Sequence, residues 1–401
     1  MAENRFKRYG KKFEKHNKNG NQKFTSTKSF KIGLIVVLAV LFVVIGLNIQ
    51  NLSPSNIVNW VQGSVLGMSR GSGFPCEIVG SKVDANNFTI FDNDISYTSD
   101  TSFVALNKSA AEDVNRQHSF SNPIYKSTNN YALIYNLGTK SFQLEKKSKT
   151  VLKANLDNNI ICGSVSQNGK CAFITGSNDY LSEMVVLSSK NGEVKEEYKY
   201  YFSEYYITNV AISSDGKSGV ACGIYSDSGV LKSAVYIFNF NSETPKEIIE
   251  YNDNMIVDLQ YGSNGKAVAI FDKSASIINT SKKTHVDYSY ENKSLLCYEI
   301  NEGIISLALS ETSTGGNGKV VVLDLSGKQK TMIDTDVKVL SVSSYGNKIA
   351  ILSDSQVYEY TSGGNKKNSF KVSGDSKKIK LAKNNKLYIL GICKISTLHL
   401  T

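Results

Sequence analysis

Two patterns of hydrophobic and polar positions divide the chain. Residues 32–49 (IGLIVVLAVLFVVIGLNI) form an uninterrupted apolar run that contains no charged residue. From residue 74 to the end, short apolar stretches alternate with groups of Gly, Asn, Asp and Ser. The first pattern is typical of one apolar helix and the second of many short β-strands.

The apolar run is long enough to cross a membrane as a helix. At ~1.5 Å per residue, about 18 residues reach ~27 Å, close to the ~30 Å hydrocarbon core of a bilayer. Helices of soluble cores are usually shorter or carry a polar face, and a cleaved signal peptide ends in a small-x-small site, which does not follow Ile49. The run predicts an uncleaved signal anchor, with a buried helix and a cleaved signal peptide as alternatives.

Charge sets the expected orientation of this anchor. The chain has a net charge of +10, and residues 1–31 hold ten Lys or Arg against two Glu. Because cytoplasmic flanks of membrane helices are rich in Lys and Arg, we expect a cytoplasmic N-terminus and an extracytoplasmic C-terminal domain in the cell membrane. Since the tail holds most of the charge, the composition predicts no nucleic-acid binding by the ectodomain.

Four segments follow from these patterns. They are a basic cytoplasmic tail (1–31), a transmembrane helix (32–49), a juxtamembrane amphipathic helix with a linker (50–73) and an extracytoplasmic domain (74–401). Trp60, the single tryptophan, suits the membrane interface, although packing of its helix on the folded domain is an alternative.

A repeated unit organises residues 74–401. Each copy has an alternating strand, a tight polar turn and a continuous apolar strand, and the spacing of the turns is typical of the ~40–50 residues of a four-stranded propeller blade. Eight turns are recognised, near Asn93, Asn129, Asn168, Asp215, Asn264, Glu302, Gly346 and Asn384. They predict an all-β fold, a β-propeller of eight blades, with seven blades as the alternative.

The ends of the repeat region predict how the ring closes. The last unit, from residue 377, supplies three strands, and residues 74–79 form a lone strand before the first full unit. Completing the last blade with that strand removes two exposed edges. Cys76 and Cys393 would then lie on neighbouring strands, where they form either a ring-closing disulfide or, in a reducing habitat, free thiols.

The sequence contains no recognisable catalytic or cofactor motif. The four histidines are scattered, the six cysteines lack a zinc spacing, and residues 314–320 (TGGNGKV) lack the first glycine and the hydroxyl of a phosphate-binding loop. We therefore predict no catalytic residues, no metal ligands and no cofactor. A hydrolase or lactonase with a site in the central channel is the alternative, and it would need converging acids such as Asp258 with partners from other inner strands.

Tyrosines concentrate between the third and fourth units, at Tyr198, Tyr200, Tyr201, Tyr205 and Tyr206. Tyrosines beside loops of Ser, Gly and Asn suit a surface for glycan or peptide. The more ordinary interpretation is an outer strand whose tyrosines pack between blades. The expected partners are the lipid bilayer and a cell-wall glycan, a peptide or an envelope protein.

Several stretches resemble a known family. The basic tail, the single anchor and the segments SPSNIVNWVQGSVLG, SDTSFVALN and SSDGKSGVA are similar to membrane-anchored bacterial proteins of clostridial type, a family described as a domain of unknown function. The resemblance implies a propeller-like ectodomain outside the cell and assigns no active residues. We therefore expect a binding or scaffold module at the bacterial cell surface, with a propeller enzyme as the alternative.

Overall fold

The computed structural model of the chain describes residues 71–401 except residues 191, 263, 302 and 317. The predicted tail, the predicted transmembrane helix (32–49) and Trp60 lie outside the described residues. Among the residues that are described, no helix has the length and apolar character needed to cross a bilayer.

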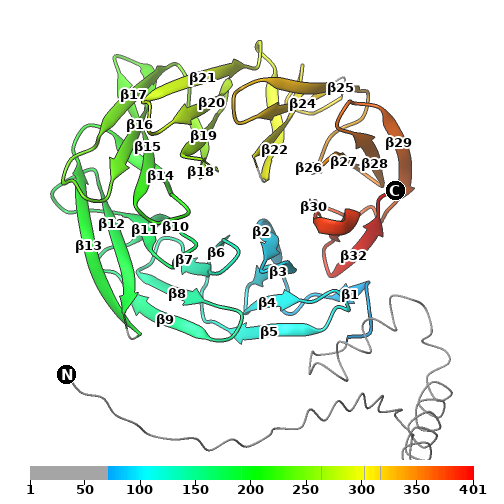
Figure 1. Ribbon diagram of the computed structural model, residues 1–401, viewed down its shortest axis with the longest axis horizontal. Coiled ribbons are helices and arrows are strands. Elements are labelled where there is room, and N and C mark those ends of the chain that lie inside the picture. The colour runs from blue at the N-terminus through cyan, green and yellow to red at the C-terminus, as the bar shows by residue number, and fades with distance from the viewer. Residues whose placement is uncertain (1–70, 191, 263, 302, 317) are drawn as a thin grey trace, which may run out of the picture. The chain divides into compact units, whose positions relative to one another are not determined.

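The described chain forms eight antiparallel sheets of four strands, arranged as blades around one axis (Figure 1). The all-β propeller and its eight blades are therefore confirmed. Blades 1 to 4 consist of β2 (Val83–Phe91), β3 (Asp94–Ser99), β4 (Ser102–Leu106) and β5 (Glu112–Gln117); β6 (Pro123–Ser127), β7 (Ala132–Asn136), β8 (Ser141–Glu145) and β9 (Thr150–Asn155); β10 (Ile160–Val165), β11 (Cys171–Thr175), β12 (Ser182–Lys190) and β13 (Glu193–Phe202); β14 (Tyr206–Ile212), β15 (Ser218–Asp227), β16 (Val230–Asn239) and β17 (Glu247–Asn252).

The remaining blades repeat this order. Blades 5 to 8 consist of β18 (Ile256–Tyr261), β19 (Lys266–Phe271), β20 (Ser274–Asn279) and β21 (Thr284–Ser289); β22 (Ser294–Asn301), β23 (Ile304–Ser310), β24 (Gly318–Asp324) and β25 (Gln329–Thr335); β26 (Ser341–Tyr345), β27 (Lys348–Ser353), β28 (Gln356–Thr361) and β29 (Lys366–Lys371); β30 (Lys378–Leu381), β31 (Lys386–Leu390), β32 (Lys394–His399) and β1 (Cys76–Glu77). A 3₁₀ helix, η2 (Lys383–Asn385), joins β30 to β31. The first strand of each blade lies nearest the axis (Figure 1).

The turns between first and second strands fix the hairpins. At Asn264 and Gly265 both φ angles are positive (57° and 68°), as a type I′ turn requires. At Asp215–Gly216 only the glycine is left-handed (φ 67°), so this longer connection is not a type I′ turn. A Cβ on Gly216 would lie 2.8 Å from the Asn168 side chain, which donates a hydrogen bond to the Asp215 carbonyl (2.8 Å). The turn therefore also joins neighbouring blades.

The hydrophobic core lies between blades, because each sheet is covered on both faces by its neighbours. The second strands β7 and β11 are buried at every position. One cluster joins Phe142 of blade 2 to Phe173 of blade 3, with ring centroids 4.7 Å apart. The blade interfaces therefore supply most of the buried apolar area that stabilises the ring.

The ring closes as predicted, through the lone N-terminal strand. β1 pairs with β32 as the outermost strand of the last blade, with Cys76 opposite Ile395. The Ile78 amide donates a hydrogen bond to the Cys393 carbonyl (2.9 Å), and the Phe74 ring packs on Tyr388 at 5.5 Å. The first and last parts of the described chain are thus held in one sheet.

The proposed disulfide is not formed in this structure, where Cys76 and Cys393 are both free thiols. The register sets Cys76 opposite Ile395, two residues beyond Cys393. Diagonal neighbours on paired strands lie ~7–8 Å apart, beyond the ~4.4–6.8 Å between the Cα atoms of a disulfide. The bond stays a prediction, and forming it would require a shift in the backbone.

Thiol labelling tests this arrangement. Burial raises the pKa of the Cys76 thiol to about 11, and the thiolate is the reactive form. At pH 8 we expect iodoacetamide to label the exposed Cys393 rapidly and Cys76 only after unfolding, as measured by peptide mass spectrometry. Labelling of Cys393 that requires prior reduction would contradict the free thiols and support the disulfide.

Candidate functional site

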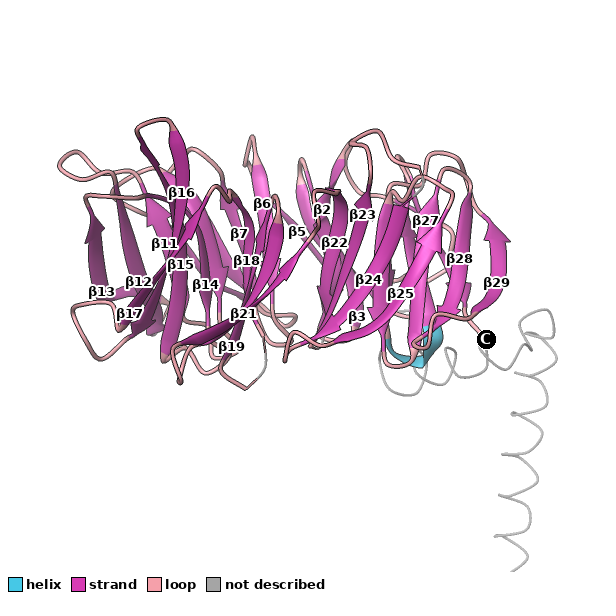
Figure 2. Ribbon diagram, turned by 90° about the horizontal axis from the view of Figure 1, so that it is seen from above, coloured by secondary structure: helices cyan, strands magenta, loops and turns pink. Residues whose placement is uncertain are grey.

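The ring has two faces that differ in the strand ends they carry (Figure 2). On one face lie the connections from second to third strands and from each fourth strand to the next blade, including the β15–β16 hairpin at the top of Figure 2. We call it the tyrosine face. The other, which we call the basic face, carries the connections from first to second and from third to fourth strands, including η2 at the bottom of Figure 2.

The structure divides the five predicted tyrosines. Tyr200 and Tyr205 are buried (4% and 2% exposed), and Tyr198 is partly buried against the same inter-blade cluster. Tyr201 and Tyr206 are exposed, at 52% and 43%. Tyr198, Tyr200 and Tyr205 therefore pack between blades, as the more ordinary interpretation expects. Of the five tyrosines, only Tyr201 and Tyr206 are available to a ligand.

The buried tyrosines fix blade 3 against blade 4. The Tyr200 hydroxyl donates a hydrogen bond to the Ser242 carbonyl (2.9 Å), and its ring lies 4.6 Å from that of Phe238. The Tyr205 hydroxyl donates to Glu250 Oε1 (2.8 Å), and burial together with this carboxylate raises the pKa of Tyr205. Both hydroxyls therefore remain protonated donors, and Tyr201, which alternates with Tyr200 along β13, points to solvent.

Exposed hydrophobic side chains collect on the tyrosine face. Thirteen large hydrophobic residues are exposed among those described, and nine lie at strand ends or connections of this face. Eight of the nine belong to blades 3, 4 and 5, and we call them the apolar strip: Tyr180, Leu181, Tyr201, Tyr206, Tyr225, Val230, Met255 and Val257. The rings of Tyr180 and Tyr201 are 4.7 Å apart. The sequence analysis singled out Tyr201 and Tyr206 among these eight residues, and the other six lie at or near polar connections without a concentration of aromatic residues.

A cleft of about 560 Å³ lies where blade 5 meets blade 6, and Val257 of the apolar strip lines it. Its apolar wall includes Val257 and, from the innermost strand β22, Leu295 and Leu296. Asp272 and Lys273 of the β19–β20 connection supply polar groups. Binding pockets commonly have volumes of about 300–1,000 Å³, so this cleft could hold a side chain or a short segment of a ligand.

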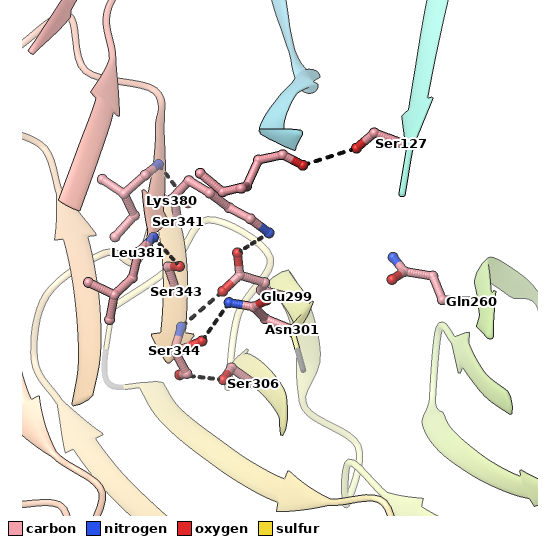
Figure 3. A network of polar contacts seen from close by, with 12 residues as sticks. Ser127, Gln260, Glu299, Asn301, Ser306, Ser341, Ser343, Ser344, Lys380 and Leu381 are labelled. Carbon is pink, nitrogen blue, oxygen red and sulfur yellow. Dashed lines mark hydrogen bonds and ion pairs between the residues drawn. The ribbon is translucent and has the colours of Figure 1, made fainter. Parts of the chain in front are cut away.

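Polar contacts join the innermost strands of blades 6, 7 and 8 (Figure 3). Lys380 Nζ lies 2.7 Å from Glu299 Oε1, and the Ser344 amide donates a hydrogen bond to Glu299 Oε2 (2.9 Å). Asp258, the acid considered for catalysis, accepts a hydrogen bond from Gln260 Nε2 (2.7 Å). Glu299 and Asp258 therefore each have partners within the ring.

Serines satisfy the free edges of inner strands. The Ile379 and Leu381 amides of β30 donate to the hydroxyls of Ser341 and Ser343 in β26, at 3.3 and 2.8 Å (Figure 3). An unpaired strand edge would otherwise leave N–H groups without acceptors. The sequence analysis did not predict these hydrogen bonds. The pattern that could have indicated them is the alternation of serines along the first strand of a blade, as at Ser341 and Ser343.

The two faces carry opposite charge in their connections. Among the described residues, the connections of the tyrosine face contain six lysines and eleven acids, namely Asp100, Asp157, Asp179, Glu204, Asp253, Asp272, Glu291, Glu311, Asp336, Asp354 and Asp375. Those of the basic face contain three acids and eleven lysines, namely Lys108, Lys146, Lys147, Lys149, Lys170, Lys217, Lys246, Lys282, Lys283, Lys328 and Lys383. Cationic ligands are therefore favoured on the tyrosine face and anionic ligands on the basic face.

Solved structures share the fold at low sequence identity. Sqt1 of Saccharomyces cerevisiae is 10% identical, with a TM-score of 0.55 over 83% of this chain and 100% of that one. A streptogramin B lyase (12% identity, TM-score 0.47, 82% and 98% coverage) and BamB from Moraxella catarrhalis (12%, 0.39, 68% and 92%) are less similar in shape. At 10% identity the likeness to Sqt1 shows the propeller fold alone.

Sequence comparisons place the chain in a family. The search of curated proteins gave no significant match. The model of one family, described as a family of unknown function (DUF5711), matches residues 77–400, which include nearly all of the ring. The chain therefore belongs to this family of unknown function, DUF5711.

Proposed function

We propose that the chain is a single-pass, membrane-anchored binding module of the bacterial cell surface, whose tyrosine face holds an extended, basic and apolar segment of a partner protein. The observation that carries this proposal is that nine of the thirteen large hydrophobic side chains exposed in the described part of the chain gather on one face. Exposed apolar patches that are rimmed by polar residues mark interaction sites, and tyrosines are frequent anchors of interfaces.

Charge and shape favour a polypeptide partner. The apolar strip crosses three successive blades, as an extended segment would, and acids such as Asp179 and Glu204 lie in the same connections. Lys and Arg of a partner would meet these carboxylates and the exposed rings of Tyr201 and Tyr206, where cation–π contacts are available. The cleft beside Val257 would take an apolar side chain of the same segment.

The membrane location rests on the sequence. The apolar run at 32–49 and the ten basic residues of the tail support an anchor with a cytoplasmic N-terminus. An extracytoplasmic ring would then present its tyrosine face to proteins outside the membrane.

A peptide array tests the partner class. We expect the full-length chain in nanodiscs to bind peptides that combine Lys or Arg with apolar residues more tightly than acidic peptides of equal hydrophobicity. The combined substitution Tyr201→Ala and Tyr206→Ala should weaken this binding at least tenfold, because interface tyrosines contribute about 1–2 kcal/mol each. Affinities are measured by fluorescence anisotropy with the best peptide.

The matched control replaces exposed apolar residues elsewhere. Val286 and Met332 are 50% and 43% exposed on the outer strands β21 and β25. Their replacement by Ala should leave the affinity unchanged. Equal losses in both variants, or binding of glycans or acidic peptides in preference to basic ones, would overturn the proposal.

A further inference from the structure

We propose that the basic face docks on the phosphate head groups of an anionic phospholipid bilayer, so that the tyrosine face points away from the membrane. This inference concerns the face opposite to the apolar strip and goes beyond the proposed function. It rests on the placement of unpaired lysines and on the point where the chain joins the ring.

The lysines of the basic face form a broad ring of charge. Lys147 is paired with Asp94 and Asp113, Lys170 with Glu197, and Lys283 with Glu247. Seven others are exposed and form no ion pair within the described part of the chain: Lys108, Lys149, Lys217, Lys246, Lys282, Lys328 and Lys383.

These seven lysines are spread around the ring. They come from blades 1, 2, 4, 5, 6 and 8, at connections that all open on the same face (Figure 2). Such a spread does not enclose a small anion, but it matches a flat surface of negative charge. Lysine clusters of this kind are attracted to anionic leaflets, each lysine as a compact point charge.

The chain joins the ring on this same face. The amides of Gly71 and Gly73 donate hydrogen bonds to Ser109, to its hydroxyl (3.1 Å) and to its carbonyl (2.9 Å), and Ser109 lies in the β4–β5 connection of the basic face. A Cβ on Gly71 would lie 2.2 Å from the Ser109 carbonyl oxygen, so this approach needs glycine. The described part of the chain therefore enters the ring at its basic face.

The composition of the face favours lipid over nucleic acid. The basic residues of its connections are all lysines. Arg116, the only arginine among the described residues, lies on the outermost strand β5 and is paired with Glu145. Base reading depends largely on the planar fork of arginine, whereas attraction to a charged leaflet needs only positive charge near the surface.

Lysine footprinting tests the orientation. The full-length chain is placed in nanodiscs of phosphatidylglycerol or of phosphatidylcholine, and acetylation rates of individual lysines are measured by mass spectrometry. In the anionic discs the seven lysines should react at least about fivefold more slowly, and 1 M salt should remove the difference because it shortens the Debye length to ~3 Å. Lys140 and Lys338, exposed on the tyrosine face, serve as internal controls and should react equally in both discs.

Charge reversal separates docking from unrelated protection. The fourfold variant Lys149→Glu, Lys217→Glu, Lys282→Glu and Lys328→Glu should restore fast acetylation of Lys246 and Lys383 in anionic discs. The control variant Lys140→Glu with Lys338→Glu should retain their protection. Equal rates in both kinds of disc, or protection that appears only when a soluble anionic polymer is added to phosphatidylcholine discs, would overturn the inference.

Discussion

Replacing Lys380 by methionine should lower the free energy of unfolding of the ring by about 3–5 kcal/mol, the cost of leaving a buried carboxylate without its partner. The Glu299 side chain is 4% exposed and the Lys380 side chain 14%, with 2.7 Å between their charged atoms. Methionine keeps the length of the side chain but removes the ammonium group. Because Glu299 also holds the Ser344 amide of the intervening blade, the loss should loosen the inner strands of three blades.

Urea unfolding followed by circular dichroism measures this effect. Lys378 provides a matched control, since it lies two residues earlier on β30 and has no ion pair among the described residues. Lys378→Met should change the free energy by no more than about 0.5 kcal/mol. Adding Glu299→Gln to Lys380→Met should recover part of the loss, because no charge then remains buried. Equal stability of Lys380→Met and Lys378→Met would show that the ion pair does not join the blades.

The second large effect is expected at the closure of the ring. Ile395 is fully buried opposite Cys76, in the cluster that joins blade 8 to blade 1. Ile395→Ala should remove about 2–5 kcal/mol of stability by leaving a cavity beneath the closing strand. Hydrogen exchange should show faster exchange of the Ile78 amide, which bonds to Cys393 in the intact ring.

Ile392 supplies the control for this prediction. It lies three residues before Ile395, in the β31–β32 connection, and is 56% exposed. Ile392→Ala should leave the unfolding midpoint and the protection of Ile78 unchanged. If the Ile78 amide already exchanges freely in the unmodified chain, β1 does not close the ring and this part of the account is wrong.

The fold could be predicted because its signals are local. Asn or Asp followed by Gly marks hairpin turns, and three blades carry such a pair between their first and second strands, at Asn168–Gly169, Asp215–Gly216 and Asn264–Gly265. The other blades carry Asn, Asp or Gly in other combinations at the same place. In the first blade the turn lies at Asp92 and Asn93, and both residues are left-handed (φ 48° and 66°). The closing strand followed from counting strands in the last unit.

The candidate site could be predicted only in part, because its members meet through the ring. Glu299 and Lys380 are 81 residues apart in the sequence, and neither position has a local pattern that names its partner. The apolar strip consists of pairs of residues at four connections, and those connections are separated by whole strands in the sequence. The sequence does show part of the basic face, because a lysine follows the turn glycine at Gly169, Gly216 and Gly327. These lysines can be assigned to one surface only when the fold shows that the three turns lie on the same face of the ring.

The most direct test of the account is photo-cross-linking from position 201 of the full-length chain in the cells that naturally produce it. A benzophenone amino acid in place of Tyr201 should give adducts with a polypeptide, whose cross-linked segment carries Lys or Arg beside apolar residues. The same group in place of Met332, on the outer strand β25, should not give these adducts. Identical adducts from both positions, or only lipid or glycan adducts from position 201, would contradict a protein-binding tyrosine face.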